Sequence, residues 1–229
     1  MKRRANSPMK ILALEFSTER RSVALARSGA GGPPAVLAEA HSDSRDVGAL
    51  TLVSQVLAAA KWDRTEIECL AVGVGPGSYA GIRGAIALAQ GWQLARDVKL
   101  LQVSSVDALI TQAQQKKLSG PINVVIDAQR NEFYLARYDI GPAGLKPIQP
   151  LRIVSLAEVQ RHEAAGETMI GPEVTRWFPR GEVMFPEAAV IAELAASRTD
   201  FLAGEKMEPI YLRETNFIKA PPLRVIPGV

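Results

Sequence analysis

The order of the apolar segments constrains the fold of this chain more than any other feature of its sequence. Three short apolar runs come first, at residues 9–16, 22–27 and 35–40, and polar or glycine- and proline-rich residues separate them. Runs of this length between turn-forming residues are typical of strands joined in hairpins. The chain is therefore predicted to open with three antiparallel strands.

Helices and strands alternate after these three strands. Apolar residues recur at helical spacing in residues 47–60, 79–95 and 106–117, and short apolar runs at residues 69–74 and 99–103 predict strands between the helices. An antiparallel meander extended by strands that arrive through helical crossovers forms a mixed sheet. The order βββαβαβα is that of a ribonuclease H-type lobe.

The chain partly repeats this pattern after a Ser-Gly-Pro break at residues 119–121. Further strands are predicted at residues 122–127, 132–138, 151–154 and 168–170, and further helices at residues 155–162 and 187–197. We therefore expect an α/β protein with two lobes, mixed sheets and a reduced second lobe. Its predicted parts are a flexible N-terminal extension at residues 1–8, a first lobe at residues 9–118, a smaller second lobe at residues 119–205, and a C-terminal segment at residues 206–229 that returns toward the first lobe.

The composition is that of an ordinary globular protein. The 229 residues are 47% hydrophobic and 22% charged, which is enough to bury a substantial core. The net charge is only +3, and three basic residues at positions 2–4 supply part of it, so the chain carries only weak signs of nucleic-acid contact. A single cysteine, Cys69, excludes an intramolecular disulfide. The first apolar run ends at Glu15, which is too short for a secretory signal, and we expect a cytoplasmic protein.

A glycine-rich turn at residues 75–77 joins a predicted strand to the helix at residues 79–95. Free amides at the start of that helix could hold an anion, with Gly75, Gly77 and Ser78 as the candidate residues. The alternative is a tight connection that needs glycine for its backbone geometry, and this interpretation is favoured. The turn lacks the Lys followed by Ser or Thr that ends a P-loop, and no acid follows the next strand as a dinucleotide site requires.

The helix after the glycine turn is apolar nearly all round, and Arg83 is its only charged residue within positions 79–95. A stripe of small residues runs along it at Ala80, Gly84, Ala87 and Gly91. Such a helix needs cover on both sides, and a stripe of small residues lets another backbone approach closely. Membrane insertion is disfavoured because the span is shorter than about 20 residues and contains Arg83. Two interpretations stay open on the residues alone: the stripe packs against other helices of this chain, or it binds a second protein.

Residues for catalysis or metal binding are not evident. The two histidines, His41 and His162, fall in different predicted lobes, and neither has a second ligand at helical spacing. No serine stands in a Gly-x-Ser-x-Gly elbow. Glu15 and Asp127 fall at the ends of predicted strands, where an actin-like ATPase keeps carboxylates for magnesium and water, but acids at strand ends are also common solvated residues. We predict no catalytic residue, no cofactor and no metal site.

Five segments, in this order along the chain, resemble the successive landmarks of one protein family. They lie at residues 11–18, 41–42, 75–83, 126–132 and 209–213, and together they span nearly the whole chain. The family is TsaB, also called YeaZ, and the glycine turn with its helix is the most specific part of the likeness. The resemblance implies a two-lobed fold of the actin-like ATPase (ribonuclease H-like) type, related to TsaD and to glycoprotease M22-like proteins.

The resemblance also implies a function and a set of partners. It implies a non-catalytic scaffold that pairs with a TsaD-like catalytic subunit through helices of the first lobe and helps to recruit a TsaE-like ATPase. Transfer of a threonylcarbamoyl group to adenosine in tRNA would belong to the TsaD-like subunit, and this chain would reach tRNA only through the complex. It implies no membrane partner, and a homodimer when the chain is alone. The candidate interface residues are Leu50, Val53, Leu57, Ala80, Gly84, Ala87 and Gly91.

This chain departs from the family pattern at several positions. The family usually has Asp where this chain has Glu15, and Thr where it has Ala80, which opposes phosphate binding at the turn between the first two strands. TsaD carries a pair of metal-binding histidines one helical turn apart, and the matching positions here are Ser105 and Leu109. A serine and a leucine cannot replace two imidazole ligands, so the departures favour a subunit without catalytic chemistry.

Two other functions stay open. An ATPase or small-molecule kinase of the same fold is motivated by Glu15 and Asp127, but it needs a glycine-rich adenosine loop in the second lobe, where Gly166 and Gly171 stand isolated. A metallopeptidase follows from an older label attached to the superfamily. It is less favoured, because it requires metal ligands that the sequence does not bring together.

Overall fold

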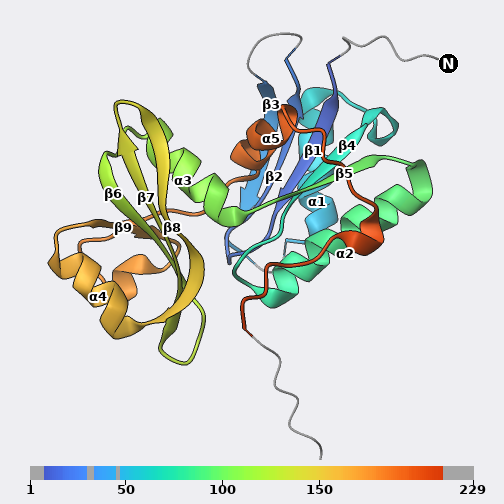
Figure 1. The fold of residues 1–229 in the computed structure, drawn as a ribbon. Coiled ribbons are helices and arrows are strands. Elements are labelled where there is room, and N and C mark those ends of the chain that lie inside the picture. The colour runs from blue at the N-terminus through green and yellow to red at the C-terminus, as the bar shows by residue number, and fades with distance from the viewer. Residues whose placement is uncertain (1–7, 30–33, 45–46, 214–229) are drawn as a thin grey trace, which may run out of the picture.

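The computed structural model describes residues 8–29, 34–44 and 47–213, and Figure 1 shows two lobes lying side by side. Each lobe is built on a mixed sheet of five strands. Except for Pro8, the predicted extension at residues 1–8 lies outside the described residues, and so does the part of the predicted C-terminal segment from residue 214 onward.

The first sheet has the strand order β3-β2-β1-β4-β5. Its strands are β1 (Lys10–Glu15), β2 (Arg21–Arg27), β3 (Ala35–Ser42), β4 (Cys69–Gly73) and β5 (Lys99–Val103). The first three strands pair antiparallel, and β4 and β5 run parallel to β1. The predicted meander with parallel additions is therefore confirmed.

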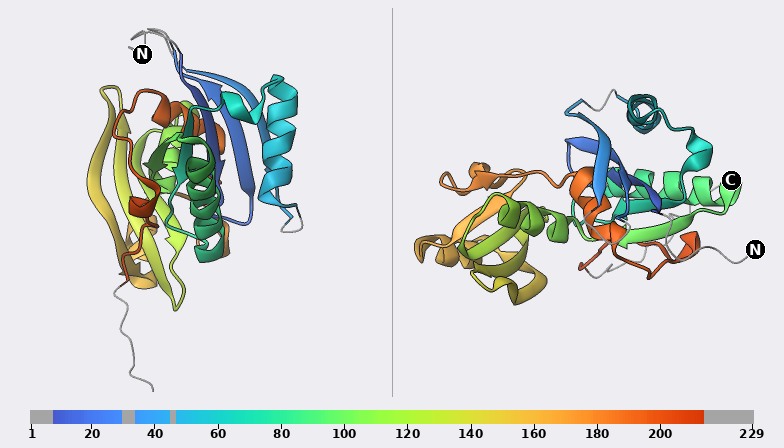
Figure 2. Two further views of the ribbon diagram at one scale, coloured as in Figure 1. Left: turned by 90° about the vertical axis from the view of Figure 1, so that its right-hand side faces the viewer. Right: turned by 90° about the horizontal axis from the view of Figure 1, so that it is seen from above.

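Helices cover both faces of the first sheet. The helices α1 (Ala49–Ala60) and α2 (Tyr79–Arg96) pack on one face, and α5 (Ala188–Ala196) packs on the other, as the views in Figures 1 and 2 show. Alternate residues of β1 point to the two faces, so that Leu12 lies under α1 and α2 while Ala13 lies under α5. Burial on both faces explains why β1 has no alternation of apolar and polar residues.

The second sheet has the strand order β10-β9-β6-β7-β8. Its strands are β6 (Gly120–Asp127), β7 (Glu132–Gly141), β8 (Gly144–Ser155), β9 (Thr168–Gly171) and β10 (Glu182–Val183). The helix α4 (Leu156–Ala164) packs on β7 and β8. The helix α3 (Ser105–Gln115) packs on the other face, where Leu109 and Ile110 join the core formed with β6.

Two helices cross over between the lobes. The helix α3 falls in the range 9–118 by sequence, yet its apolar face packs on the second sheet. The helix α5 falls in the range 119–205, yet it packs on β1 and β2 of the first sheet. Small side chains on that sheet face, Ala24 and Ala26 among them, let the alanine-rich helix approach closely. The helices α3 and α5 also contact each other, so they form the joint between the two lobes.

The strand β8 is longer than the sequence predicted, since it begins at Gly144 and the predicted strand began at residue 151. Pro147 and Pro150 interrupt the apolar pattern in this segment. Proline cannot donate to a strand ladder, but β8 is an edge strand that pairs only with β7, where proline is tolerated. None of the helices among the described residues combines the length and the apolar character needed to cross a membrane.

Candidate functional site

The glycine turn packs directly against the end of β1. The backbone N–H of Ser78 donates to the carbonyl oxygen of Ser17 at 2.6 Å. A Cβ atom on Gly77 would lie 2.2 Å from that same oxygen, and a Cβ atom on Gly81 would lie 1.9 Å from the carbonyl oxygen of Phe16. Real Cβ atoms do not approach backbone oxygens so closely, which gives these glycines a packing reason that needs no ligand.

The anion candidates Gly75, Gly77 and Ser78 lie together at the start of α2. The Ser78 hydroxyl accepts a hydrogen bond from the N–H of Gly81 at 3.4 Å, so its side chain already caps the helix. Gly75 donates its N–H to the Ser105 hydroxyl at 3.2 Å. Side chains and backbone of this chain therefore occupy part of the hydrogen-bonding capacity that an anion would use.

Glu15, at the end of β1, is buried inside the first lobe. The Ser105 hydroxyl donates to its Oε2 at 2.7 Å, and the backbone N–H of Ser17 donates to its Oε1 at 2.6 Å. The carboxyl group also fills the space beside Gly73, where a Cβ atom would lie 2.0 Å from Oε2. Burial raises the pKa of Glu15, and the hydrogen bonds from Ser17 and Ser105 oppose that shift. This carboxyl group is thus committed to internal packing.

Glu15→Gln is expected to change how stability depends on pH. Because burial raises the folded-state pKa above the ordinary value of 4.5, the folded chain holds the proton more tightly than the unfolded chain does. The resulting stabilisation is fully present below pH 4.5 and is lost as the pH rises toward the folded-state pKa, by about 1.4 kcal/mol per pH unit at most. Glutamine does not titrate, so the variant lacks this loss. The free energy of unfolding of the variant minus that of the wild type, measured in urea, should therefore rise from pH 4.5 to pH 8. A constant difference between the two proteins would mean that Glu15 titrates normally.

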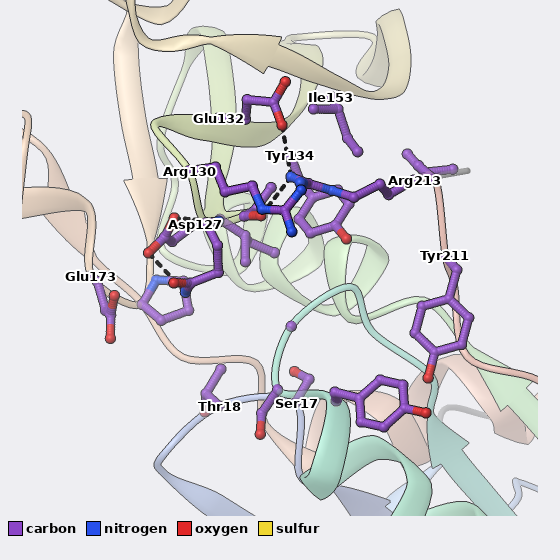
Figure 3. A pocket seen from close by; sticks show the side chains of 18 of the residues that line it. Ser17, Thr18, Asp127, Arg130, Glu132, Tyr134, Ile153, Glu173, Tyr211 and Arg213 are labelled. Atoms are coloured by element: carbon purple, nitrogen blue, oxygen red, sulfur yellow. Dashed lines mark hydrogen bonds and ion pairs between the residues drawn. The ribbon is translucent and has the colours of Figure 1, made fainter. Parts of the chain in front are cut away.

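A cleft of about 1530 Å³ separates the two lobes. Ser17 and Thr18 line it from the first lobe, and Asp127 and Arg130 line it from the second (Figure 3). The Asp127 carboxylate accepts from the backbone N–H of Gln129 at 2.7 Å and from the Gln129 side chain at 3.2 Å. Glu15 does not line the cleft, so the two strand-end acids do not form a carboxylate pair there. Within residues 8–29, 34–44 and 47–213, no three His, Cys, Asp or Glu side chains are grouped as metal ligands.

The small-residue stripe of α2 lies on its outer face. All four members of the stripe are exposed: Ala80, Gly84, Ala87 and Gly91. A Cβ atom on Gly84 or on Gly91 would meet no described atom within 4 Å, apart from the backbone of α2 itself. The opposite face of α2 is buried through Ile82, Ala85 and Ala89. The sequence predicted cover on both sides of this helix, and in the single chain only the inner face is covered by described residues.

The three candidates on α1 do not share one surface. Leu50 is 64% exposed, and Leu57 is half-buried against the core. Val53 is only 3% exposed and packs between α1 and the sheet, so its side chain is not on the surface and the prediction for this residue is wrong. At about 100° per residue, Val53 lies some 60° from Leu50 around the helix, and this rotation is enough to bring it onto the core-facing side.

Sequence reasoning missed a cluster of exposed side chains beside the stripe. The rings of Tyr79 and Tyr211 stack with their centroids 5.6 Å apart. Arg83 donates from Nη1 to the Tyr79 hydroxyl at 2.7 Å, and its guanidinium lies 5.1 Å from the centre of that ring. Tyr211 belongs to one of the landmark segments, but its neighbours lie more than 120 positions away in the chain. Only the landmark could have drawn attention to it.

The segment after residue 206 bridges the two lobes. Met207 lies in the core of the first lobe, and the N–H of Ile210 donates to the carbonyl oxygen of Val74 at 2.9 Å. A few residues later, Arg213 donates from Nη2 to the Glu132 carboxylate at 2.7 Å and to the carbonyl oxygen of Ala128 at 2.9 Å. Figure 3 shows Arg213 reaching Glu132 in the second lobe while Tyr211 points toward the first.

Comparison with known proteins shows that this chain is similar to proteins of threonylcarbamoyladenosine synthesis in tRNA. A family model described as "TsaD: tRNA N6-adenosine threonylcarbamoyltransferase" matches residues 14–212. The chain is 28% identical over 222 residues to the tRNA threonylcarbamoyladenosine biosynthesis protein TsaB of Escherichia coli (strain K12), covering 90% of this chain and 95% of that protein. It is 28% identical over 153 residues to the protein of the same name from Bacillus subtilis (strain 168), covering 66% of this chain and 64% of that protein.

Solved structures share the fold. A Pseudomonas aeruginosa protein described as similar to peptidase YEAZ has a TM-score of 0.72 at 24% identity, covering 90% of this chain and 100% of that chain. YeaZ from Pseudomonas aeruginosa has a TM-score of 0.70 at 23% identity, covering 89% of this chain and 100% of that chain. The predicted two-lobed α/β fold of the actin-like type is therefore confirmed.

Proposed function

Because the chain belongs to the TsaB (YeaZ) family, within the wider family of TsaD-type proteins, we propose that it is a non-catalytic subunit of the machinery that makes threonylcarbamoyladenosine in tRNA. In this role it pairs with a TsaD-type enzyme subunit, which carries out the transfer to adenosine. It acts in the cytoplasm, and it reaches tRNA through the complex.

The non-catalytic part of this proposal rests on the burial and the hydrogen bonds of Glu15. An actin-like ATPase needs a strand-end carboxylate that faces the cleft between the lobes, whereas this one is enclosed and hydrogen-bonded within the first lobe. Ser105 and Leu109, the positions that the resemblance pairs with the two metal-binding histidines of TsaD, are both fully buried. One is bonded to Glu15 and the other belongs to the core with β6, so both have packing roles.

The outer face of α2 supports the pairing part. Its four small residues leave a smooth exposed strip, and Leu94 on the same helix is 90% exposed. An apolar face of this kind, open over several turns of a helix, is typical of a surface that a second polypeptide covers. The same face would serve self-association of the chain when the partner is missing, and the assembled pair would recruit the TsaE-like ATPase.

Reconstitution tests this proposal directly. The chain should show no threonylcarbamoyl transfer to tRNA on its own, and the TsaD-type subunit of the same organism should gain activity when the chain is added. The pair should co-elute from a gel-filtration column. Transfer by the chain alone would overturn the non-catalytic role, and a TsaD-type subunit that ignores the chain would overturn the pairing.

Calorimetry separates this proposal from an ATPase or kinase of the same fold. Titration of the chain with magnesium and ATP should show no binding in the micromolar range, because Glu15 is enclosed and Asp127 already accepts two hydrogen bonds from Gln129. Micromolar binding that disappears in an Asp127→Asn variant would instead favour a nucleotide-dependent enzyme.

A further inference from the structure

More than half of the exposed large apolar side chains among the described residues lie on α1, α2 and the segment that bridges the lobes. The described residues include nine exposed large apolar side chains, and five of them lie on α1, α2 or the bridging segment: Leu50, Tyr79, Leu94, Tyr211 and Leu212. Scattered exposed apolar residues are normal, but exposed side chains that contact one another across two elements, as Tyr79 and Tyr211 do, mark an interaction surface. The surface therefore extends beyond α2 to the segment that bridges the lobes.

Tyr79, Arg83 and Tyr211 form what we call the tyrosine–arginine cluster. Tyr79 is 58% exposed and Tyr211 is 49% exposed, yet the stack between their rings and the bond from Arg83 hold both in place. Tyrosine and arginine are enriched among the residues that carry protein–protein binding energy. A preformed aromatic pair loses little conformational entropy on binding, so the cluster is well suited to a protein contact.

The cluster is continuous with the small-residue stripe. Tyr79 directly precedes Ala80 in α2, and Arg83 directly precedes Gly84. A partner whose backbone lies along the stripe would meet the cluster at the N-terminal end of the helix. The Arg83 guanidinium has five N–H groups and interacts with the hydroxyl groups of both tyrosines, so a partner's carboxylate or carbonyl oxygen could bind its remaining N–H groups.

Arg213 anchors the segment that carries Tyr211 to the second lobe. It lies two residues after Tyr211, and its two hydrogen bonds tie the segment to Glu132 and to Ala128 in the second lobe. On the other side of Tyr211, Ile210 is bonded to Val74 of the first lobe. Tyr211 is therefore fixed between two anchors, one on each lobe.

We propose that the tyrosine–arginine cluster is part of the surface that contacts the TsaD-type subunit, and that Arg213 is a positioning residue for Tyr211 within it. This inference rests on the pairing proposed above and adds to it a contact region in which Tyr211 of the bridging segment joins Tyr79 and Arg83 of α2. Binding of the partner would then depend on the arrangement of both lobes, because the bridging segment is anchored to each.

An aromatic pair beside arginines could also stack on unpaired bases of RNA. The charges near the cluster favour a protein, because four acids and three arginines line the adjoining cleft, which gives an RNA backbone no net attraction. The acids are Glu19, Asp127, Glu132 and Glu173, and the arginines are Arg21, Arg130 and Arg213.

Calorimetric titration of the full chain with the TsaD-type subunit tests the cluster. Tyr211→Ala should weaken binding by about tenfold or more, as expected for a central aromatic contact. Ile148→Ala, which removes an exposed apolar side chain from the edge strand β8, is the control and should leave the affinity unchanged. Thermal unfolding should show that both variants are folded. Wild-type affinity in Tyr211→Ala would overturn the inference.

The role of Arg213 has its own test. Arg213→Ala should weaken binding several-fold in the wild-type background and should have no further effect in the Tyr211→Ala background, because a positioning residue acts through the residue that it positions. Additive losses would show that Arg213 acts independently and would overturn its assignment.

Three further outcomes would have different consequences for the inference and for the proposed function. Failure of the wild-type chain to bind the TsaD-type subunit would contradict the proposed pairing itself, and the cluster would fall with it. If Gly84→Leu abolishes binding while Tyr211→Ala binds with wild-type affinity, the pairing stands and the cluster alone is refuted. If Tyr211→Ala lowers the affinity of the chain for tRNA but not for the TsaD-type subunit, the cluster is an RNA contact instead.

Discussion

Gly81→Ala is expected to lower the free energy of unfolding by about 2 to 3 kcal/mol or more. Alanine is the better helix former by about 1 kcal/mol, so helix propensity alone would predict a more stable protein. The added Cβ atom, however, would lie 1.9 Å from the carbonyl oxygen of Phe16 and 3.1 Å from its carbonyl carbon. Both are backbone atoms at the end of β1, so the helix or the strand must shift, and the steric cost exceeds the gain in propensity.

The same helix provides a matched control for this substitution. Gly84→Ala makes the same chemical change one turn further along α2, where no described atom outside the helix backbone lies within 4 Å of the new Cβ. It should raise the free energy of unfolding by about 0.5 to 1 kcal/mol. Urea unfolding of the two variants should therefore give shifts of opposite sign. Equal stability of the two would mean that the turn is not packed on β1 as described.

Local patterns predicted most of the helices and strands. The strand β5 has the predicted bounds, Lys99–Val103, and α2 ends one residue beyond the predicted position. Both elements carry strong local signals, since a short buried strand is a continuous apolar run and α2 begins at a serine cap after the glycine turn. The strand β8 escaped prediction in part, because its two prolines oppose a strand except at a sheet edge, and edge position is a property of the assembled sheet.

Packing between distant segments could not be predicted in the same way. Nothing in the periodicity of α3 or α5 indicates which sheet each helix covers, because an apolar face fits either. The status of Val53 depends on the rotation of α1 about its axis, and that rotation is set by contacts with the sheet. Tyr211 belongs to a surface cluster only because its ring stacks on that of Tyr79, more than 120 positions earlier in the chain.

The candidate site also combines features that local sequence patterns indicate with features that depend on residues far apart in the chain. The sequence indicated the small-residue stripe of α2, though not its exposure, because small residues at helical spacing are a local feature, and it also indicated the acids at the ends of β1 and β6. It did not indicate that Glu15 is enclosed. That depends on the Ser105 hydroxyl, 90 positions away, and on the space that Gly73 leaves beside the carboxyl group.

Gly84→Leu is expected to weaken binding of the TsaD-type subunit by about a hundredfold or more while leaving the fold intact. The position faces solvent, so a leucine meets nothing in the single chain, and unfolding should change by no more than about 1 kcal/mol. In the proposed complex the same side chain would stand between α2 and the partner backbone that lies along the stripe. Gel filtration and calorimetry with the wild-type partner measure this loss.

Two variants show whether the loss comes from the position or from an added leucine. Gln114→Leu places a leucine on an exposed position of α3, outside the stripe, and should bind as the wild type does. Ala87→Leu adds bulk within the stripe and should weaken binding as Gly84→Leu does. Because both leucines are exposed on helices, aggregation or a general surface effect would act on them equally. Undiminished binding by Gly84→Leu would show that the partner lies elsewhere, and the outer face of α2 would then need another explanation.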